Sequence, residues 1–337
     1  MKGSFCPREL YLSSVILLEF SMLYFCAIET GKIHTALCVN CPRLCGASRE
    51  PGNYGVCNTG NEFSIASITA HFGEEPVISG RRGICNIFFS HCNLQCIYCQ
   101  NYQISRNDEY GTAWELEDII RKITGLLDSG ITSVGFVSPT HMTGQVMEII
   151  NALGKEGRKP AYVWNSNGYD RVRILKELED VIDVYLPDFK YADAELGASL
   201  SGVDDYPVSA LKAIKEMVRQ KGTSLIMNDD GTVASGVIIR HLVLPGHVEN
   251  SKASLRLIAE EISPAVTVSL MSQYHPIPGI KGHPELNRTL TQDEYEEVLD
   301  KYYGLGFFRG WTQDLASGST LNPDFEKEDP FAFPVSE

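Results

Sequence analysis

The sequence has little positive charge. Of its 337 residues, 29 are Lys or Arg and 43 are Asp or Glu, which leaves a formal net charge of −14. This balance argues against a nucleic-acid partner, because phosphate backbones are bound by concentrated Lys and Arg. The sequence also has no long internal repeat and no low-complexity tract, so it lacks the patterns of repeat architectures and biased segments.

Long apolar runs are scarce as well. One stretch, Leu10–Ile28, is mostly apolar and follows Lys2 and Arg8, which is similar to a signal peptide or a short membrane helix. Glu19 interrupts the stretch, and no clean small-residue cleavage site follows it. We therefore expect a packed helix or an extended start, with a membrane or interfacial segment and a secretion signal as the alternatives. A membrane partner is not expected.

The remaining composition is ordinary for a globular protein. Apolar residues make up 43% and charged residues 21% of the chain, which excludes a mainly disordered chain, a collagen and a coiled coil. The length suits about two domains, or one α/β barrel with an appendage, and it allows a large buried core.

The middle of the chain alternates short apolar segments with helical ones. Short strands that are apolar throughout are expected when both faces of a parallel sheet are covered. We expect an α/β fold, a partial or complete parallel (β/α) barrel of about six βα units, with a doubly wound sheet as the alternative. In both folds, functional residues follow the C-terminal ends of the strands. The predicted strands are 84–89, 133–137, 161–164, 184–186, 237–244 and 267–271, and the predicted helices are 116–127, 144–153, 171–178, 207–220, 251–262 and 291–303.

Three zones divide the chain. Residues 1–80 are predicted to form an N-terminal extension with a cysteine knuckle, residues 81–310 the barrel, and residues 311–337 a C-terminal strap. Aromatic residues such as Trp311 and Phe325 make the strap too apolar for a free tail. We expect the strap to pack on the barrel, with docking of a protein partner as the alternative.

Ten cysteines are the unusual feature of the composition. The chain is long, and it groups its thiols closely, unlike a small disulfide-rich secreted domain. Clustered thiols in a reduced compartment are typical of metal ligands, which favours the cytoplasm. The first group, called the knuckle, is Cys38, Cys41, Cys45 and Cys57; the second, called the triplet, is Cys92, Cys96 and Cys99; the others are Cys6, Cys26 and Cys85.

The triplet directly follows a predicted strand. Cys92, Cys96 and Cys99 have the spacing C-x3-C-x2-C. Three thiolates at this spacing can hold one cubane iron–sulfur cluster, and they leave one iron open, because full cysteine ligation needs four. The alternatives are a zinc site completed by His91 and a ferredoxin-type cluster completed by Cys85. Cys85 lies inside the strand, where we expect it to pack as a small hydrophobe.

This segment resembles the radical S-adenosylmethionine (SAM) superfamily. The segment is similar to the pyruvate formate-lyase activating enzyme branch: it reads FFSHCNLQCIYCQN, with Tyr98 directly before the last cysteine. It looks closer still to an uncharacterised group of that branch that has an extra N-terminal cysteine knuckle. The resemblance extends from residue 37 to residue 333.

The resemblance implies a chemistry and its partners. In that superfamily the open iron of a [4Fe–4S] cluster binds SAM, and an electron from the cluster cleaves SAM to a 5′-deoxyadenosyl radical that abstracts hydrogen. The protein places the cofactors and excludes water. A reducing electron donor is therefore implied, and the branch implies a protein substrate with a glycine as the hydrogen source. The departures described next leave a different substrate open.

Two strand ends depart from the branch. After the second predicted strand, Ser138 and Thr140 stand where relatives have a Gly-Gly-Glu turn that contacts SAM, and an ordinary Pro turn is the alternative. After the third, Asn165 and Ser166 match an Asp and a Thr that help to hold SAM. Asn165 can hydrogen-bond but does not neutralise a cation. The Asn-Gly pair that follows is also a common turn signal.

Other strand ends match the branch. Asp188 and Lys190 alternate onto one face of an extended segment, and a buried pair of opposite charges is costly unless a ligand or partner matches it. The resemblance implies that Lys190 contacts SAM, with a structural ion pair as the alternative. It further implies that Arg240 and His275 help to position SAM and that Tyr98 lies near the adenine.

The knuckle has the spacing C-x2-C-x3-C-x11-C, with Pro and Gly in the loops between thiols. Four thiolates suit tetrahedral zinc or a second, all-cysteine iron–sulfur cluster, and their sulfur atoms are predicted to point at one centre. Zinc would fold the N-terminal zone, whereas a cluster would relay electrons. Free thiols or a disulfide are the alternative.

The sequence therefore predicts a cytoplasmic radical SAM oxidoreductase in which Cys92, Cys96 and Cys99 are the cluster ligands. A non-catalytic iron–sulfur electron carrier or cluster scaffold is the main alternative, and it would need no SAM pocket. A zinc-knuckle interaction module with a decayed barrel is a third hypothesis, which the intact triplet argues against.

Overall fold

A computed structural model of the protein describes residues 37–107, 112–315, 322–327 and 329–331. The residues from Cys38 onward form one compact unit. The apolar stretch Leu10–Ile28, and with it Cys6 and Cys26, lies outside the described residues.

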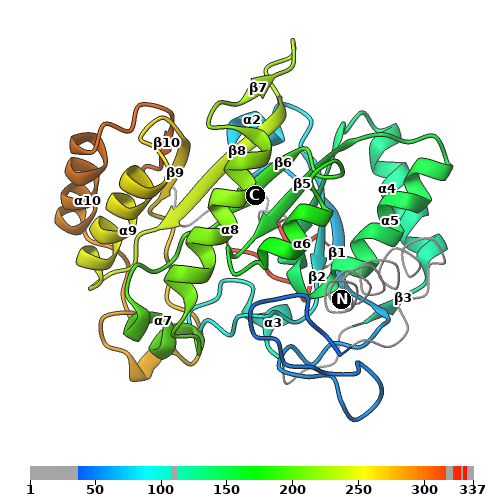
Figure 1. Ribbon diagram of the computed structural model, residues 1–337, viewed down its shortest axis with the longest axis horizontal. Helices are drawn as coiled ribbons and strands as arrows, with labels where there is room; N and C mark the ends of the chain where they lie inside the picture. Colours follow the sequence, from blue (N-terminus) through cyan, green and yellow to red (C-terminus); the bar gives the residue numbers. More distant parts are fainter. Residues whose placement is uncertain (1–36, 108–111, 316–321, 328, 332–337) are drawn as a thin grey trace, which may run out of the picture. The chain divides into compact units, whose positions relative to one another are not determined.

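One sheet runs through this unit, and its six central strands are parallel (Figure 1). Neighbours in the sheet are also neighbours along the chain among these six, whereas a doubly wound sheet reverses its order at a switch point. The predicted α/β fold with a partial (β/α) barrel is therefore confirmed. The six strands are β2 (Ile84–Phe89), β4 (Ser133–Val137), β5 (Ala161–Ser166), β6 (Val184–Pro187), β8 (Val233–Leu242) and β9 (Thr267–Met271).

The outer strands of the sheet were not predicted. β1 (Phe63–His71) lies antiparallel to β2 and carries the short strand β3 (Ala113–Trp114) on its other side. At the opposite edge, β10 (Gly310–Thr312) pairs in parallel with β9. The short strand β7 (Ile226–Met227) lies outside the main strand order and pairs antiparallel with β8. Since β3 and β10 are the two ends of the strand order, the barrel is open between them.

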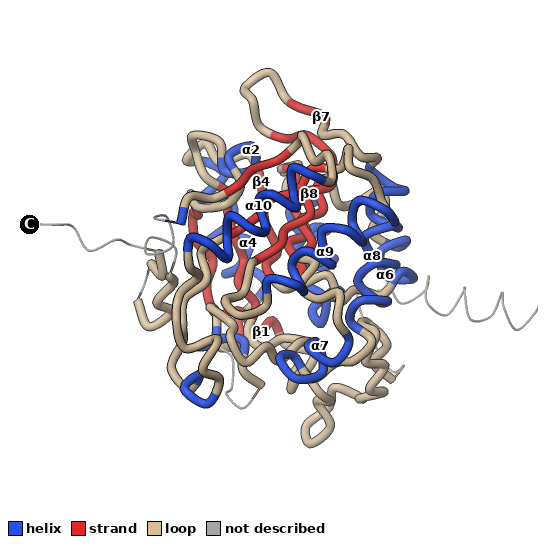
Figure 2. The backbone as a smooth tube through the Cα atoms, turned by 90° about the vertical axis from the view of Figure 1, so that its left-hand side faces the viewer, coloured by secondary structure: helices blue, strands red, loops and turns tan. Residues whose placement is uncertain are grey.

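Helices cover the outside of the strands, as Figure 2 shows. All six predicted helices are present, and their ends differ from the prediction by at most three residues. None of the helices in the described ranges combines the length and the apolar character needed to cross a bilayer. The predicted helices are α4 (Leu116–Asp128), α5 (Thr143–Lys155), α6 (Val172–Glu177), α8 (Tyr206–Lys221), α9 (Val248–Glu261) and α10 (Gln292–Gly304); the further short ones are α2 (Pro76–Ser79), α3 (Tyr102–Ser105), α7 (Ala194–Ser201), η1 (Pro139–Met142) and η2 (Ile280–Gly282).

The two faces of the sheet bury two separate apolar clusters. The large cluster lies between the strands and the covering helices, and it includes Cys85 and Trp164. The small cluster uses the alternate strand positions, such as Ile84 and Val184, together with Ile78 of α2. Ile84 and Val184 are the first residues of their strands, so α2 fills the barrel interior at the N-terminal ends. The C-terminal ends of the strands remain for polar residues.

Candidate active site

The triplet lies on the loop after β2, and all three cysteines are free thiols. Cys92 is buried, whereas Cys96 and Cys99 are half-buried. Each sulfur accepts at least one hydrogen bond, from a backbone amide, a side-chain amide or a hydroxyl. The donors are Leu94 N (3.4 Å) and Asn167 Nδ2 (3.4 Å) to Cys92, Ser201 Oγ (3.0 Å) to Cys96, and Ser105 Oγ (3.3 Å) to Cys99.

The triplet fits an iron–sulfur cluster. Burial, with the nearby Cys96 and Cys99, raises the pKa of the Cys92 thiol to about 12, and burial also raises the pKa of Cys99, so a bound metal would favour the thiolate form of both. No three His, Cys, Asp or Glu side chains in the described ranges are arranged around a single ion. Each thiolate of a cubane binds a different iron, so the triplet needs no such convergence. Cys85 is fully buried in the large apolar cluster and is no candidate for a fourth ligand.

A buried charge network lies at the ends of β5, β6 and β8. Arg240 donates from Nε to Asp188 Oδ1 at 2.8 Å, from Nη2 to Asn165 Oδ1 at 2.6 Å and from Nη1 to Glu74 Oε2 at 3.3 Å. Lys190 Nζ donates to the second oxygen of Asp188 at 2.6 Å. We call these five residues the strand-end network. Four of them are residues that the sequence analysis singled out.

Lys190 interacts electrostatically with both this network and the triplet. Burial opposes its charge, but Asp188 and the nearby sulfur atoms of Cys96 and Cys99 raise the pKa of Lys190 above its usual value. Burial likewise opposes ionisation of Asp188, yet Arg240 and Lys190 lower its pKa. The pair is thus held fully charged although each side chain is less than a fifth exposed.

Glu74 is a member of the network that the sequence analysis missed. It follows β1, and its Oε1 accepts hydrogen bonds from Asn86 Nδ2 at 2.9 Å and from Asn165 Nδ2 at 3.1 Å. Glu74 carries no motif of its own. The available signal was Asn86, a polar residue inside the apolar strand β2, because a buried amide requires partners.

Asp170 is a second missed residue, and it engages two of the predicted oxygens. Thr140 Oγ1 donates to Asp170 Oδ1 at 2.7 Å, and Ser166 Oγ donates to Asp170 Oδ2 at 2.5 Å. Both hydroxyl protons are therefore used inside the protein. Ser138 has a positive φ of 52°, and its backbone N–H donates to Asn165 O at 2.8 Å. Contacts of Ser138 and Ser166 with SAM stay predictions.

A close backbone approach joins the β5 and β6 loops. Gly168 has a φ of +78°, and a Cβ atom there would lie 2.1 Å from the carbonyl oxygen of Asp188. Only glycine satisfies both conditions, so the Asn-Gly turn does more than end a strand: it allows the two loops to meet at the network.

Tyr98 and the segment after β9 lie against each other. The Tyr98 ring is 6.3 Å from the ring of Tyr274, and Tyr191 Oη donates to Tyr98 Oη at 2.7 Å. Gln100 Nε2 donates to the carbonyl oxygen of Gln273 at 2.8 Å. The half-buried His275 thus stands on a segment that contacts the triplet loop, while its contact with SAM stays a prediction.

Much of the chain that forms this site matches a known protein family. The model of the radical SAM superfamily matches residues 86–258, from β2 to α9. The chain belongs to the radical SAM superfamily. Membership implies a [4Fe–4S] cluster and SAM as cofactors, and an enzyme that uses radical chemistry.

This radical SAM chain is similar to one uncharacterized protein and, at lower identity, to several solved structures. It is 31% identical over 280 residues to the uncharacterized protein MJ0674 of Methanocaldococcus jannaschii, covering 81% of this chain and 76% of that protein. Among solved structures, Streptococcus suis SuiB bound to SAM has a TM-score of 0.44 at 16% identity, covering 68% of this chain and 50% of that one. HydG, a maturase of the [FeFe]-hydrogenase, has a TM-score of 0.46 at 14% identity, covering 66% and 48%. The chain spans about half the length of these two solved chains.

The knuckle of this radical SAM protein gathers around one small cavity. Its four cysteines line that cavity together with Asn93 and His141. All four are free thiols, so the predicted alternative of a disulfide is not observed. The four residues line one cavity, but their sulfur atoms are not arranged as the ligands of one ion, whereas the sequence predicted that they point at one centre.

The knuckle thiols differ in their ionisation. Burial raises the pKa of the Cys41 thiol to about 12 and also raises that of Cys57. Burial opposes ionisation of Cys45 too, but the backbone at Ala47 and Val56 lowers its pKa. Two of the four thiols are thus hard to ionise without a cation.

Two side chains bind the knuckle segment to the triplet loop. Arg43 Nε donates to the carbonyl oxygen of Asn93 at 2.6 Å. Asn107 Nδ2 donates to the carbonyl oxygens of Val56 at 2.6 Å and Cys92 at 3.0 Å, and its Oδ1 accepts from Cys92 N at 3.0 Å. The two cysteine groups are therefore neighbours in space.

The strap contacts the barrel through aromatic rings. Phe325 and Phe331 lie 5.3 and 5.4 Å from the ring of Phe88 on β2, and Phe331 lies 4.1 Å from the ring of His71. Phe325 N donates to Gln103 Oε1, just after the triplet, at 2.9 Å.

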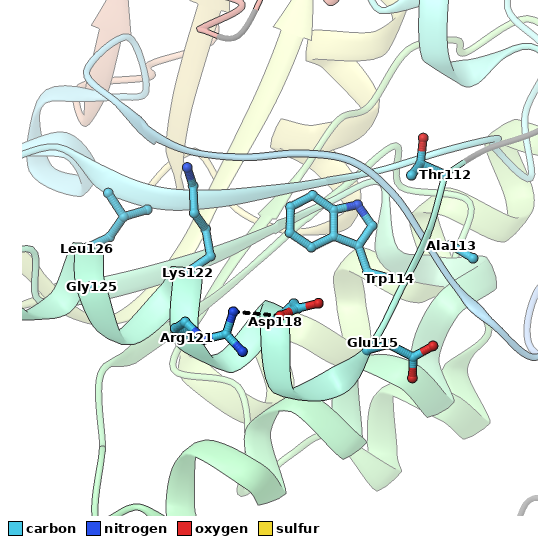
Figure 3. A pocket seen from close by; sticks show the side chains of 9 residues that line it. All are labelled: Thr112, Ala113, Trp114, Glu115, Asp118, Arg121, Lys122, Gly125 and Leu126. Carbon is cyan, nitrogen blue, oxygen red and sulfur yellow. Dashed lines mark ion pairs between the residues drawn. The ribbon is translucent and has the colours of Figure 1, made fainter.

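A shallow pocket elsewhere on the protein has no part in this site. It lies where β3 meets α4 and is lined by Trp114 and by the Asp118–Arg121 ion pair, whose atoms are 2.7 Å apart (Figure 3). Trp114 is tied down, since its Nε1 donates to the carbonyl oxygen of Ile65 at 3.0 Å. The pocket contains no cysteine and no histidine.

Proposed function

We propose that this protein is a radical SAM oxidoreductase of the pyruvate formate-lyase activating enzyme-like branch. Cys92, Cys96 and Cys99 hold the [4Fe–4S] cluster, which, when bound and reduced, supplies the electron that cleaves SAM to a 5′-deoxyadenosyl radical. The observation that carries the proposal is the position of Lys190. Its ammonium group donates to Asp188, which also accepts from Arg240, and Asp188 together with the sulfur atoms of Cys96 and Cys99 raises the pKa of Lys190.

The side chains of this chain then have defined tasks. Lys190 and Arg240 present donors and positive charge to the carboxylate end of SAM, and Asp188 holds both cations in place. Tyr98 packs near the adenine and His275 near the methionyl part. The pocket is completed by Ser138, Ser166 and Asn165. Asn165 would contact SAM through the N–H and the oxygen lone pair that its bonds to Glu74 and Arg240 leave unused.

The hydrogen atom is proposed to come from a glycine of a protein partner, as the branch resemblance implies. A reducing protein supplies the electron. We place the enzyme in the cytoplasm, because free thiols and a reducible cluster are maintained in a reduced compartment.

The decisive test is product release. Anaerobically reconstituted and reduced protein is expected to release 5′-deoxyadenosine and methionine from SAM. The alternative, an electron carrier or cluster scaffold, would exchange electrons without releasing either product. A carrier also has no use for the strand-end network, because buried charges are costly without a ligand or a structural gain.

The knuckle is proposed to be a second metal site, holding zinc or a second iron–sulfur cluster. The shared cavity and the raised pKa values of Cys41 and Cys57 support it, because a metal cation would lower both. The thiols must close around the metal on binding, since their present arrangement does not surround an ion. Next to the triplet loop, a second cluster could pass electrons, and zinc would fix the loop.

We expect Cys41→Ser to remove the knuckle metal and leave the triplet cluster. Wild-type protein should contain zinc, or more iron than one [4Fe–4S] cluster accounts for, and the variant should lose that excess, because Cys41 is a buried thiol of the shared cavity. Metal analysis of anaerobically purified samples measures this. A Cys96→Ala sample is the reciprocal control and should keep the knuckle metal. Wild-type protein with one cluster and no zinc would establish free thiols instead.

Ser201→Ala is expected to lower the reduction potential of the cluster. Ser201 Oγ donates to Cys96 Sγ at 3.0 Å, and a donor to a cluster thiolate stabilises the more negative, reduced state. A shift of tens of millivolts is expected, since ~59 mV corresponds to a tenfold change for one electron. Potentiometric titration followed by electron paramagnetic resonance measures it. Ser209→Ala, which removes a hydroxyl bound to Asp205 at 2.8 Å, should leave the potential unchanged.

A further inference from the structure

Glu74 lies at the junction of the strand-end network, although it comes from the loop after β1. Its side chain is only 9% exposed. Three donors converge on its carboxylate: Asn86 and Asn165 on Oε1, and Arg240 on Oε2. A buried carboxylate with three donors is fixed both in charge and in orientation.

Glu74 also determines how the Asn165 amide is turned. Asn165 Oδ1 accepts from Arg240 at 2.6 Å, whereas Nδ2 donates to Glu74 at 3.1 Å. The reverse orientation would set an N–H group against the Arg240 guanidinium and an oxygen against the Glu74 carboxylate. Both contacts would be repulsive, so the two charged residues lock the amide between them.

The charge balance of the network depends on Glu74. Arg240 and Lys190 bring two positive charges into a site where Asp188 alone would supply one negative charge, because Asn165 is neutral. Glu74 supplies the second negative charge through its ion pair with Arg240. The buried Glu75 also acts on Arg240, but burial raises its pKa, so Glu74 is the carboxylate of this loop that is ion-paired with the guanidinium, and its removal breaks a largely buried pair, which is costly.

We propose that Glu74 is a positioning residue for SAM: it supplies the carboxylate that position 165 lacks and thereby orients Arg240 and Asn165 toward the cofactor. This inference rests on the proposed function, since it concerns the same SAM pocket. Glu74 acts through its neighbours and needs no contact with SAM itself.

Glu74→Gln is expected to weaken SAM binding by about tenfold or more, because the loss of a charged hydrogen-bond partner misorients both neighbours. The NH2 end of the new amide must face either the N–H groups of Asn165 and Asn86 or the guanidinium of Arg240, and both arrangements set donor against donor. Iron content and circular dichroism should stay at wild-type values. The SAM-induced change in the cluster's electron paramagnetic resonance spectrum should require correspondingly more SAM.

A second variant makes the test specific. Asn165→Asp alone places two carboxylates about as close as the present 3.1 Å contact of Asn165 with Glu74, and it should also weaken SAM binding. The double variant Glu74→Gln with Asn165→Asp returns one carboxylate and one amide to the pair. The new amide at position 74 then donates to the new carboxylate at position 165 and accepts from Arg240. The Asn86 side chain must rotate so that its oxygen, in place of its N–H group, faces the same amide. We expect the double variant to bind SAM within about threefold of wild type.

Glu62→Gln is the matched control, since it removes the charge of an exposed glutamate and should leave SAM affinity unchanged. The inference is overturned if Glu74→Gln binds SAM as wild type does, or if the double variant binds no better than the two single variants. Should Glu74→Gln fail to fold, recovery of binding in the double variant over Asn165→Asp still decides the question. Wild-type protein that neither binds nor cleaves SAM would instead overturn the proposed function.

Discussion

Cys96→Ala is expected to abolish both the iron–sulfur cluster and the cleavage of SAM. A three-cysteine site has no spare thiolate, because a cubane needs each of its three protein ligands when the fourth iron is left for SAM. Cys96 also sits in the middle of the triplet, with Ser201 as its donor at 3.0 Å. Anaerobic reconstitution followed by iron and sulfide analysis, absorbance and a 5′-deoxyadenosine assay measures the effect.

Cys85→Ala is the matched control for this loss. Cys85 is only seven residues before Cys92, but it is fully buried among apolar side chains of the large cluster. The variant removes one sulfur atom from the core, and we expect a modest loss of stability with a complete cluster. A Cys96→Ala protein that keeps a cluster responsive to SAM would contradict the ligand assignment, and loss of the cluster in Cys85→Ala would point to a fourth cysteine ligand.

The central fold was predictable because its signals are local. Strands such as β2 and β4 are buried at every residue, and a helix such as α4 carries its buried residues Ile119, Ile120 and Ile123 at helical spacing. β1 was missed because half-buried positions interrupt its apolar ones, so neither a continuous run nor a clean alternation results. β10 has three residues and exists only through its pairing with β9. No pattern within three residues predicts such a strand.

The residues of the site also fall into two groups: those that a local sequence pattern predicts and those that only the folded structure brings together. The triplet lies within eight residues, so its spacing is visible in the sequence, and the family match confirms the superfamily. Glu74 lies 91 residues from Asn165 and 166 residues from Arg240, and Ser201 lies 105 residues from Cys96. Contacts over such separations arise from strand order and loop packing. They leave no periodicity or spacing in the sequence, and only an alignment or a structure brings them together.

Lys190→Ala is expected to weaken SAM binding by about 10- to 150-fold while the cluster remains. A charge-assisted hydrogen bond is worth about 1.5–3 kcal/mol, which corresponds to this range of affinities. Asp188 keeps a charged partner in the variant, because Arg240 still donates to it at 2.8 Å. The loss should therefore appear in SAM affinity rather than in folding. Anaerobic titration calorimetry measures the affinity, and iron analysis confirms that the cluster is present.

The expected pH dependence and a second lysine make this result specific. The pKa of Lys190 is raised above its usual value, chiefly by Asp188 against the opposing effect of burial, so the residue stays protonated at neutral and mildly alkaline pH. Titration of Lys190 should thus cause no loss of SAM affinity in wild-type protein over that range. Lys215→Ala removes another paired lysine, 2.7 Å from Glu261 on the surface, and should leave affinity unchanged, since exposed ion pairs contribute little. Equal affinity of Lys190→Ala and wild type would assign Lys190 to a structural ion pair with Asp188.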